Sequence, residues 1–429
     1  MISKVKNDLF DYKNRYIMKH LFKTISLLFA LLLVISCTDV EKAQFATDST
    51  APGIVSNCNV INGAGKALIT YDLPTDEDLL YVKATYKLND GTNMEVKASA
   101  YINELEVVGF GKAAEHDITL IAVDRSGNES EPVVVKISPA DNPIYEIFSQ
   151  MKVTSDFGGL AFNWENKERV DITITVTTPD EHGQMITAQN FYSNSKIGQG
   201  YIRGYSTETS ETEGRRFAVV ISDHWGNQTA IKDSLYFPIY ETEISSDRYA
   251  KYIIPGYGDP GRYNSSSDWP KLWNGSWGTN NDHYHTKVGL SSPINLGMNL
   301  GRLVKLSRIK YYQRSGGSKW QYLYAHGNPK RFRVWGTPTT DGVQLDITEP
   351  GNDWILLTEF TSVKPSGLPL GSTNADDQQL GGLDGEDVLI PIDAPAVRWI
   401  RLEVLETWGG VTDFVHIAEL TYYGKEETN

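Results

Sequence analysis

The chain has 429 residues, with 40 Lys and Arg against 54 Asp and Glu and a formal net charge of −14 at pH 7. Nucleic-acid binding depends on Lys and Arg side chains that neutralise phosphates, and no basic stripe in the sequence offsets its acidic balance. The charge therefore excludes nucleic acid as the expected partner. The 10 Trp and 23 Tyr offer flat apolar faces with a polar group, which suit ligand contacts as well as sheet cores.

The first 36 residues have the layout of a secretion signal. Basic residues precede an apolar run at residues 25–36, and this run is shorter than the roughly 20 apolar residues that a membrane-spanning helix needs. Residues 1–17 are polar, so we expect translation to start at Met18. Removing residues 1–36 takes away six basic and two acidic residues, which leaves 34 basic and 52 acidic residues and a formal charge of −18.

A cysteine follows the apolar run directly. Residues 34–37, Val-Ile-Ser-Cys, resemble a loose bacterial lipobox, and the resemblance implies that Cys37 becomes the lipidated first residue of the mature chain. The alternative is a plain signal peptide cleaved nearby, which would leave Cys37 free to pair with Cys58, the only other cysteine. Residues 37–53 are polar and have the composition of a flexible linker. We therefore expect them to form a flexible tether that is lipidated at Cys37.

Alternation of apolar and polar residues then predicts two similar β-domains, at residues 54–139 and 144–240. Tyr71, Tyr81 and the turn at residues 124–128 resemble a fibronectin type III domain. The Asp-x-x-Gly-Asn pattern of this turn returns at residues 223–227. The sequence therefore predicts two tandem immunoglobulin or fibronectin III-like sandwiches, which we interpret as spacers.

Residues 241–429 are richer in Trp and Gly and form the predicted C-terminal domain. Within it, residues 265–424 resemble the discoidin or coagulation factor 5/8 type C domain, which is galactose-binding-like. The resemblance implies a jelly-roll β-sandwich and makes the whole chain all-β. Five segments carry the resemblance, at residues 269–275, 293–297, 306–312, 327–336, and 397–402 with 417–420.

The discoidin resemblance also implies a structural calcium site. Galactose-binding members use an acid-x-Asn-x-x-Thr run and a last-strand Glu, and calcium prefers six to eight oxygen ligands. Asn274 stands where the family commonly has Asp, and this loses one charge. Two outcomes follow: a weakly held calcium, or a loop that folds without metal. The implied set is Lys271, Asn274, Ser276, Thr279, Ala418 and Glu419.

In this fold, sugars typically bind in loops at one end of the barrel. Sugar C–H faces pack on aromatic rings, and hydroxyl pairs suit the forks of Arg, Asn and His. Trp320 and Trp408 are predicted to offer uncovered indoles, because loop Trp residues beside glycines have little core to fill. The full predicted carbohydrate-binding set is Trp320, Trp408, Tyr322, Tyr324, Arg314, His283, Tyr284 and His285.

Several of these residues have structural alternatives. His283 and His285 straddle Tyr284 at strand spacing and could bind a metal, which would require a third and a fourth ligand. Tyr322 and Tyr324 share one face of a predicted strand and could pack the sheet instead. The predictions for these residues therefore stay open between ligand contact and packing.

The motifs of common hydrolases and phosphate-binding loops are missing from the sequence, so we predict no enzyme. The whole layout resembles the surface lipoproteins of Bacteroidota polysaccharide-utilisation systems. The resemblance implies outer-membrane location, binding of a poly- or oligosaccharide, and work beside a TonB-dependent importer and its lid lipoprotein. The alternative is an adhesion or assembly lipoprotein that binds a protein partner or a host glycoconjugate.

Overall fold

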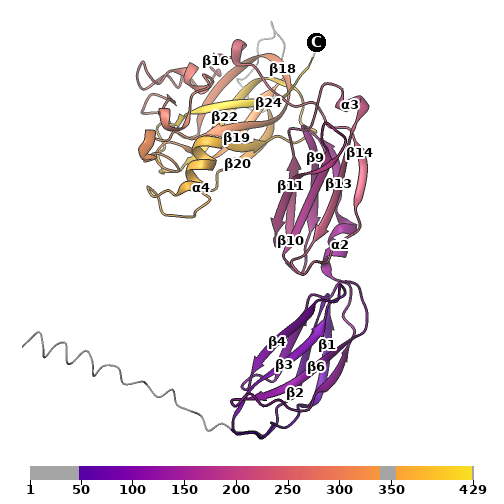
Figure 1. The fold of residues 1–429 in the computed structure, drawn as a ribbon. Helices are drawn as coiled ribbons and strands as arrows, with labels where there is room; N and C mark the ends of the chain where they lie inside the picture. Colours follow the sequence, from indigo (N-terminus) through magenta and orange to yellow (C-terminus); the bar gives the residue numbers. More distant parts are fainter. Residues whose placement is uncertain (1–47, 339–353, 428–429) are drawn as a thin grey trace, which may run out of the picture. The chain divides into compact units, whose positions relative to one another are not determined.

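The computed structural model describes residues 48–338 and 354–427 of the protein (Figure 1). The predicted signal segment, Cys37 and residues 37–47 of the predicted tether lie outside the described residues. The chain divides into two compact units, with the boundary between Asn142 and Pro143. Within the described residues, no helix is long and apolar enough to cross a membrane.

The first unit is a sandwich of two β-sheets. Alternate residues of its strands are buried, as in β2, where Ala67, Ile69 and Tyr71 face the core. Strands with one apolar face must bury it against another layer, and the two sheets cover each other. One sheet has the order β1 (Ser56–Gly63), β2 (Lys66–Asp72), β5 (Glu104–Val108); the other has the order β4 (Asn93–Ser99), β3 (Leu79–Lys87), β6 (His116–Asp124), β7 (Val133–Ile137).

The second unit begins with a sandwich of the same kind. Its short helix α2 (Pro143–Gln150) packs Ile144 and Ile147 into the core, and α3 (Ser210–Glu213) follows later. One sheet has the order β12 (Ile197–Ile202), β9 (Gly159–Glu165), β8 (Lys152–Asp156); the other has the order β11 (Met185–Ser193), β10 (Ile172–Pro179), β13 (Arg215–Ser222), β14 (Lys232–Tyr236).

The repeated Asp-x-x-Gly-Asn turns have the same hydrogen bonds in both sandwiches. In the first, Oδ1 of Asp124 accepts from the backbone N–H of Asn128 at 2.9 Å, and the Asn128 amide donates to Oδ2 at 2.8 Å. In the second, Asp223 and Asn227 make the same two bonds at 2.9 and 2.8 Å. The sequence repeat therefore corresponds to a repeated structure, because the aspartate satisfies the turn's own N–H groups.

The remainder of the second unit is a larger β-sandwich built around the long strand β18 (Ile294–Tyr312). Its main sheet has the order β15-β24-β18-β22-β19-β20, β16 and β21 also pair with β18, and β17 pairs with β23. The other strands are β15 (Thr242–Glu243), β16 (Ala250–Tyr252), β17 (Tyr284–His285), β19 (Pro329–Thr337), β20 (Ile355–Thr361), β21 (Glu386–Leu389), β22 (Val397–Thr407), β23 (His416–Ile417) and β24 (Glu419–Glu426). The helices are η1 (Ser246–Arg248), η2 (Trp269–Leu272), η3 (Gly278–Asn280), η4 (Gly317–Lys319), α4 (Ala375–Asp377) and the π-helical η5 (Gln378–Asp384).

Strand β18 contributes to two different pairings along its length. Its first part, from Ile294 to Asn299, pairs with β22, and its last part, up to Tyr312, pairs with β24. Gly301 lies between the two parts with a φ of 70°, which favours glycine. A Cβ there would also lie 2.4 Å from Cβ of Arg248. The glycine therefore lets one strand bend and serve both parts of the sandwich.

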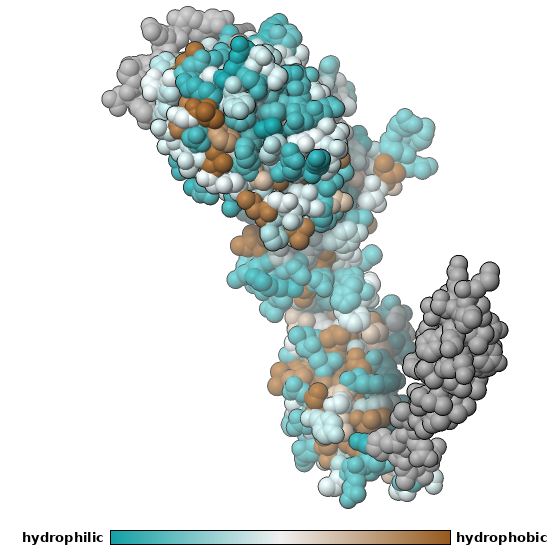
Figure 2. Space-filling model, turned by 90° about the vertical axis from the view of Figure 1, so that its left-hand side faces the viewer, coloured by the Kyte–Doolittle hydropathy of each residue, from teal (hydrophilic) through white to brown (hydrophobic). Residues whose placement is uncertain are grey.

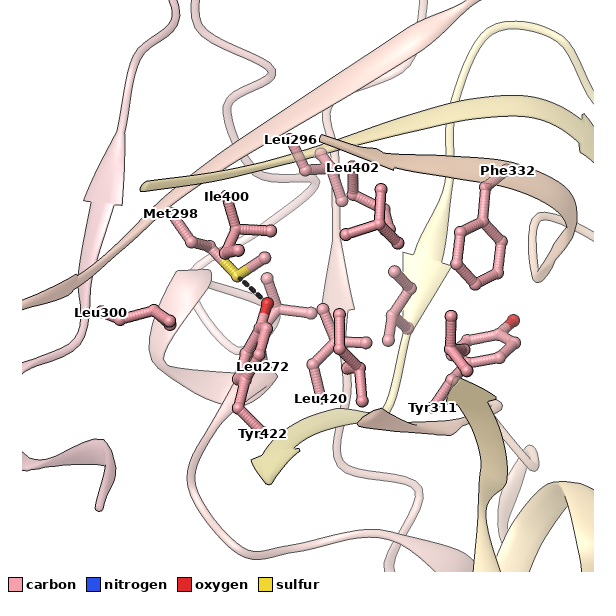
Figure 3. Packing of buried hydrophobic residues seen from close by; sticks show 14 of the residues in the cluster. Leu272, Leu296, Met298, Leu300, Tyr311, Phe332, Ile400, Leu402, Leu420 and Tyr422 are labelled. Atoms are coloured by element: carbon pink, nitrogen blue, oxygen red, sulfur yellow. Dashed lines mark hydrogen bonds between the residues drawn. The ribbon is translucent and has the colours of Figure 1, made fainter. Parts of the chain in front are cut away.

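Aliphatic and aromatic side chains from both parts of β18 meet in one core (Figure 3). Leu296, Met298 and Tyr311 of this strand are each at most 1% exposed. The Tyr422 hydroxyl donates to Sδ of Met298 at 3.3 Å, so the only polar group of that side chain is satisfied inside the core. Burial of this size holds the sandwich together without a disulfide.

The face drawn in Figure 2 is mainly hydrophilic, with hydrophobic residues exposed singly or in small groups. Exposed apolar side chains across the described residues include Tyr101, Tyr192 and Ile197, at 90%, 77% and 75%. Scattered exposure of this kind is normal for a folded protein and by itself indicates no interface.

The predicted all-β fold, with two sandwiches followed by a C-terminal β-sandwich, is confirmed. The described C-terminal sandwich begins at β15, close to the predicted domain start at residue 241. Its resemblance to discoidin stays a prediction.

Candidate functional site

Loops from distant parts of the chain meet at one end of the C-terminal sandwich. The short strand β17 pairs with β23, and this places His285 opposite His416. The loop at residues 314–326 lies against this pair of strands, since the His326 and His416 rings stack with centroids 5.2 Å apart. We call this group the loop-end cluster; its members are His283, His285, Arg314, Tyr322, His326, Phe414 and His416.

The four histidines of the loop-end cluster lie close to one another and to aromatic rings. The His283 and His285 centroids lie 6.3 and 5.5 Å from that of His416. Phe414 stacks on His285 at 4.7 Å and lies 5.1 Å from His326. His285 and His416 are buried, and His326 is exposed, so the cluster has a buried base and an accessible rim.

Burial lowers the pKa of all four rings. Desolvation lowers the pKa of His283 to about 4. It also lowers the pKa values of His285 and His326, and it lowers the pKa of His416 well below its usual range. The four imidazoles are therefore neutral at pH 7, with one N–H donor and one acceptor nitrogen each.

Hydrogen bonds determine which nitrogen of His283 and of His285 carries the proton. Nδ1 of each ring lies 2.7 Å from a backbone carbonyl oxygen, that of Asn281 for His283 and that of Thr286 for His285. Carbonyl oxygens only accept, so both rings donate from Nδ1. Nε2 of His283, a half-buried residue, is then an acceptor.

Hydrogen bonds also fix the proton position of His326 at the exposed rim. Nε2 of His416 accepts from the Gly327 backbone N–H at 3.1 Å, so this nitrogen carries no proton. Nδ1 of His326 lies 2.9 Å from it and must be the donor of that pair. Nε2 of His326 is therefore a second acceptor available to a ligand.

Arg314 supplies the only charged side chain of the loop-end cluster. Its guanidinium carbon lies 4.2 Å from the centre of the Tyr322 ring, and its Nε lies 3.5 Å from Oδ1 of Asn281. Burial lowers the pKa of Arg314, although guanidinium stays charged in proteins. Across residues 48–338 and 354–427, no carboxylate forms an ion pair with this group, so its N–H donors can meet a ligand.

Two buried amides hold the Arg314 loop from inside. Oδ1 of Asn328 accepts from the Arg314 backbone N–H at 2.9 Å, and Nδ2 donates to the carbonyls of Arg314 and Tyr322 at 3.0 and 2.6 Å. Oε1 of Gln313 accepts from the Tyr324 backbone N–H at 2.8 Å. Both amide residues are 0% exposed, so the loop has a fixed shape.

The predicted set lacks three members of the loop-end cluster, His326, Phe414 and His416, and the two buried amide residues, Gln313 and Asn328. The alternation of Phe414 and His416 just ahead of the last strand was the available signal, since it places both rings on one side. Their partners in the loop at residues 314–326 could not be found this way, because the approach depends on the β17–β23 pairing.

Trp320 does not present an uncovered indole, contrary to the prediction. It is half-buried, and its ring packs on the backbone of Gly382 in η5. A Cβ on Gly382 would lie 2.3 Å from Cζ3 of the indole. The tryptophan therefore joins two loops by packing.

Trp408 is also half-buried, and its indole is engaged by neighbours. Nε1 donates to Oγ of Ser362 at 3.1 Å, the Tyr324 ring meets it edge-on at 5.1 Å, and Nζ of Lys330 lies 5.1 Å above it. The prediction relied on the flanking glycines. Gly409 instead allows close chain contact, because a Cβ there would lie 2.6 Å from the backbone of His326.

Tyr284 and Tyr324 cannot contact a sugar as predicted, because both residues are 0% exposed. The Tyr284 hydroxyl donates to the Gly261 carbonyl at 2.7 Å, and its ring packs on Trp269 at 4.7 Å. Tyr322 and Tyr324 lie in turns where a strand was predicted. Tyr324 has a φ of 47°, which turns its side chain to the core while Tyr322 faces Arg314.

The residues predicted to hold calcium are hydrogen-bonded to one another. Oε2 of Glu419 accepts from the backbone N–H groups of Asn274 and Gly275 at 3.1 and 3.2 Å. Oδ1 of Asn274 accepts from the Ser276 backbone N–H at 3.1 Å. A calcium ion needs several oxygens turned toward one point, and here the oxygens face N–H groups. This arrangement does not fit the ion.

The remaining members of that set are also engaged or dispersed. Nζ of Lys271 lies 2.8 Å from Oδ2 of Asp282, Thr279 is exposed, and buried Ala418 donates its backbone N–H to the Tyr312 carbonyl at 3.0 Å. Calcium binding stays a prediction, which the hydrogen bonds around Glu419 do not favour.

The metal alternative for His283 and His285 has neighbours in His326 and His416, but their nitrogens do not converge. Among the described residues, ligand atoms of three or more His, Cys, Asp or Glu come within 4.8 Å of one another only at Asp48, Asp78 and Asp124. The four imidazoles are thus arranged as hydrogen-bonding groups around Arg314.

Three family models match consecutive parts of the chain, each described as a domain of unknown function. DUF4959 matches residues 52–139, DUF5126 matches residues 140–247, and DUF5000 matches residues 273–424. No curated protein matches the chain.

Solved structures similar to this chain include "SusE-like protein BT2857", at 26% identity over 66% of this chain and 100% of that one, with a TM-score of 0.41. The family 89 glycoside hydrolase from Clostridium perfringens matches at 13% identity over 43% of this chain and 15% of that one, with a TM-score of 0.26. A two-domain fibronectin type III segment of chicken tenascin matches at 12% identity over 43% and 98%, with a TM-score of 0.20. These TM-scores are all below 0.5 and assign no function to the chain.

Proposed function

We propose that the protein is a non-catalytic cell-surface lipoprotein that binds a poly- or oligosaccharide at the loop-end cluster. The observation that carries the proposal is the half-buried Arg314 guanidinium, stacked on Tyr322 and surrounded by neutral imidazoles. In the proposed role, the protein delivers the captured glycan to an outer-membrane TonB-dependent importer with its lid lipoprotein.

The loop-end cluster offers the chemistry that a sugar ring needs. Guanidinium presents a planar fork of N–H donors, which matches two neighbouring hydroxyl oxygens. Nε2 of His283 and of His326 can accept from hydroxyl O–H groups, since both rings carry their proton on Nδ1. Tyr322 and Phe414 add aromatic surface for C–H faces.

The composition of the cluster favours binding over bond cleavage. Glycoside hydrolysis requires a pair of carboxylates that flank the scissile bond. The seven members of the loop-end cluster include no carboxylate, and neutral imidazoles beside a guanidinium provide hydrogen bonds without such a pair.

The surface location rests on the sequence. An apolar run at residues 25–36 ends at Cys37, which suits lipid attachment. Anchored proteins share one surface, and weak sugar contacts gain strength when several copies hold one polysaccharide chain.

Native gels loaded with individual polysaccharides test the proposal. The chain from residue 38 onward should be retarded by at least one polysaccharide, and Arg314→Gln should abolish the retardation. Lys319→Gln is the matched control, because Lys319 is an exposed cation of the same loop. No retardation across a broad panel would favour the protein-partner alternative, and release of new reducing ends would indicate an enzyme.

A further inference from the structure

A second recess lies on the C-terminal sandwich and shares no residue with the loop-end cluster. Its volume is about 430 Å³, within the usual range of ligand sites. Side chains from β15, β24 and the loop after η2 line it. We call it the aromatic pocket and define it by Glu243, Tyr249, Trp273, Trp277, Glu419 and Tyr423.

Strand register brings the β24 side chains of the aromatic pocket together. Glu419 and Tyr423 lie four residues apart on β24 and therefore face the same side of the sheet. Glu243 of β15 lies directly opposite Tyr423, and the Tyr423 hydroxyl donates to its Oε2 at 3.3 Å.

Trp277 is held in position at the edge of the aromatic pocket. Its ring stacks on Tyr312 with centroids 4.3 Å apart and planes at 30°. Its Nε1 donates to the Leu383 carbonyl at 3.0 Å. The indole therefore keeps a fixed orientation without a ligand, which reduces the entropy lost on binding.

The lining of the aromatic pocket carries two carboxyl groups, Glu243 and Glu419, and no Lys or Arg. Glu419 is buried, its Oε2 accepts two backbone N–H groups, and burial raises its pKa to about 8, so the exposed Glu243 is the carboxylate that is charged at pH 7. The guanidinium of Arg308 lies 4.0 Å from the Tyr423 ring centre. Arg308 is already paired with Glu241 and Asp387, at 3.3 and 2.7 Å. The pocket thus combines aromatic rings with the exposed Glu243 carboxylate, and the charge of Arg308 is balanced by Glu241 and Asp387.

We propose that the aromatic pocket is a second binding site, which takes the ammonium group of an amino sugar. Aromatic rings attract cations through their negative faces, and the exposed Glu243 carboxylate can form charge-assisted hydrogen bonds with ammonium N–H groups. The sugar ring that carries the ammonium would pack on Trp277. The choice of an amino sugar rests on the proposed glycan binding; the preference for a cation rests on the pocket alone.

Calorimetric titration of the chain from residue 38 onward tests the proposal with three probes: a glucosamine hexamer, an N-acetylglucosamine hexamer and tetralysine. We expect the glucosamine hexamer to bind, and its affinity to fall as salt is raised, since charge attraction is screened. Equal or tighter binding of the N-acetylated hexamer would overturn the preference for ammonium. Equal or tighter binding of tetralysine would overturn the amino sugar in favour of a peptide.

A pair of matched variants locates the binding. Glu243→Gln removes a charge from the pocket and keeps an acceptor for Tyr423, and it should weaken glucosamine hexamer binding about fivefold or more. Glu427→Gln removes an exposed charge just after the same strand and outside the pocket and should leave the affinity unchanged. An unchanged affinity in Glu243→Gln would overturn the proposal of a second site. It would not affect the loop-end cluster, which is tested separately by the loss of polysaccharide retardation in Arg314→Gln.

Discussion

The Arg314 guanidinium lies over the ring of Tyr322, 4.2 Å from its centre, at the end of the C-terminal sandwich. Contacts of this kind contribute about 0.5–2 kcal/mol, depending on how far the cation is removed from water. The stack also limits the orientations of the planar fork, which would otherwise be free on a flexible side chain. Tyr322 therefore acts as a positioning residue for the group that we expect to bind sugar hydroxyls.

Replacing Tyr322 tests this positioning role. Tyr322→Leu keeps an apolar side chain but removes the ring, so we expect the Kd of the retained glycan to rise about fivefold or more. The melting temperature should change little, because Tyr322 is only half-buried. Calorimetric titration gives the Kd. Tyr101→Leu, at a residue that is 90% exposed in the first unit, serves as the control, and an unchanged Kd in Tyr322→Leu would contradict the role.

A methyl group on Gly409 should disturb the loop-end cluster. Its Cβ would lie 2.6 Å from the backbone of His326, so one of the two loops must shift. We expect Gly409→Ala to lower the free energy of unfolding by about 1–3 kcal/mol and to weaken glycan binding. Urea denaturation measures the first effect. Gly63→Ala is the control, because the atom nearest to its new Cβ would be a flexible Lys66 side-chain carbon at 3.3 Å. A loss of stability of similar size in Gly63→Ala would contradict the explanation.

Buried Glu386 should make stability depend on pH. Burial raises its pKa from 4.5 to about 7, although Gln313 and Ser362 donate hydrogen bonds to it. Between about pH 4.5 and pH 7, the folded state therefore holds a proton that the unfolded state has lost, and stability must fall as the pH rises through this window. Glu386→Gln removes the titrating group and keeps an acceptor oxygen.

Denaturant unfolding at pH 5 and at pH 8 checks this prediction. We expect the wild-type chain to lose about 1–3 kcal/mol more stability over this interval than Glu386→Gln does. Other titrating groups are common to both proteins and cancel in the comparison. Identical losses in the two proteins would show that Glu386 is ionised in the folded state at pH 5.

Chelation tests the calcium prediction against the hydrogen bonds seen around Glu419. Since Oε2 of Glu419 and Oδ1 of Asn274 already accept backbone N–H groups, EDTA should leave the melting temperature unchanged. Added CaCl₂ should have no effect beyond that of MgCl₂. A rise of several degrees with calcium alone would show that the loop rearranges around the ion.

Local features of this fold could be predicted from the sequence. Apolar alternation sets which strand residues are buried, and the Asp-x-x-Gly-Asn turns at Asp124 and Asp223 close by hydrogen bonds within five residues. Both depend on neighbours in the chain, which is why the two sandwiches could be recognised as a repeat.

The candidate site was predictable only in part, because its contacts join distant segments. Arg314 and His283 could be chosen by residue type, and both lie in the cluster. The partners of Trp408 and of His326 come from segments far along the chain, which strand pairing brings close. The covering of the Trp408 indole and the stacking of His326 on His416 could therefore not be predicted from the loops that carry Trp408 and His326. Glycine next to tryptophan predicted an exposed indole, but in the structure the glycine allows neighbouring segments of the chain to pack closely.

The most direct test of the central claim is NMR of the histidine rings in the chain from residue 38 onward, as a retained oligosaccharide is added. We predict that the Cε1–H resonances of His283 and His326 shift with ligand concentration, while those of exposed His182 and His224 stay in place. Saturable binding that leaves His283 and His326 unshifted would contradict glycan capture at the loop-end cluster.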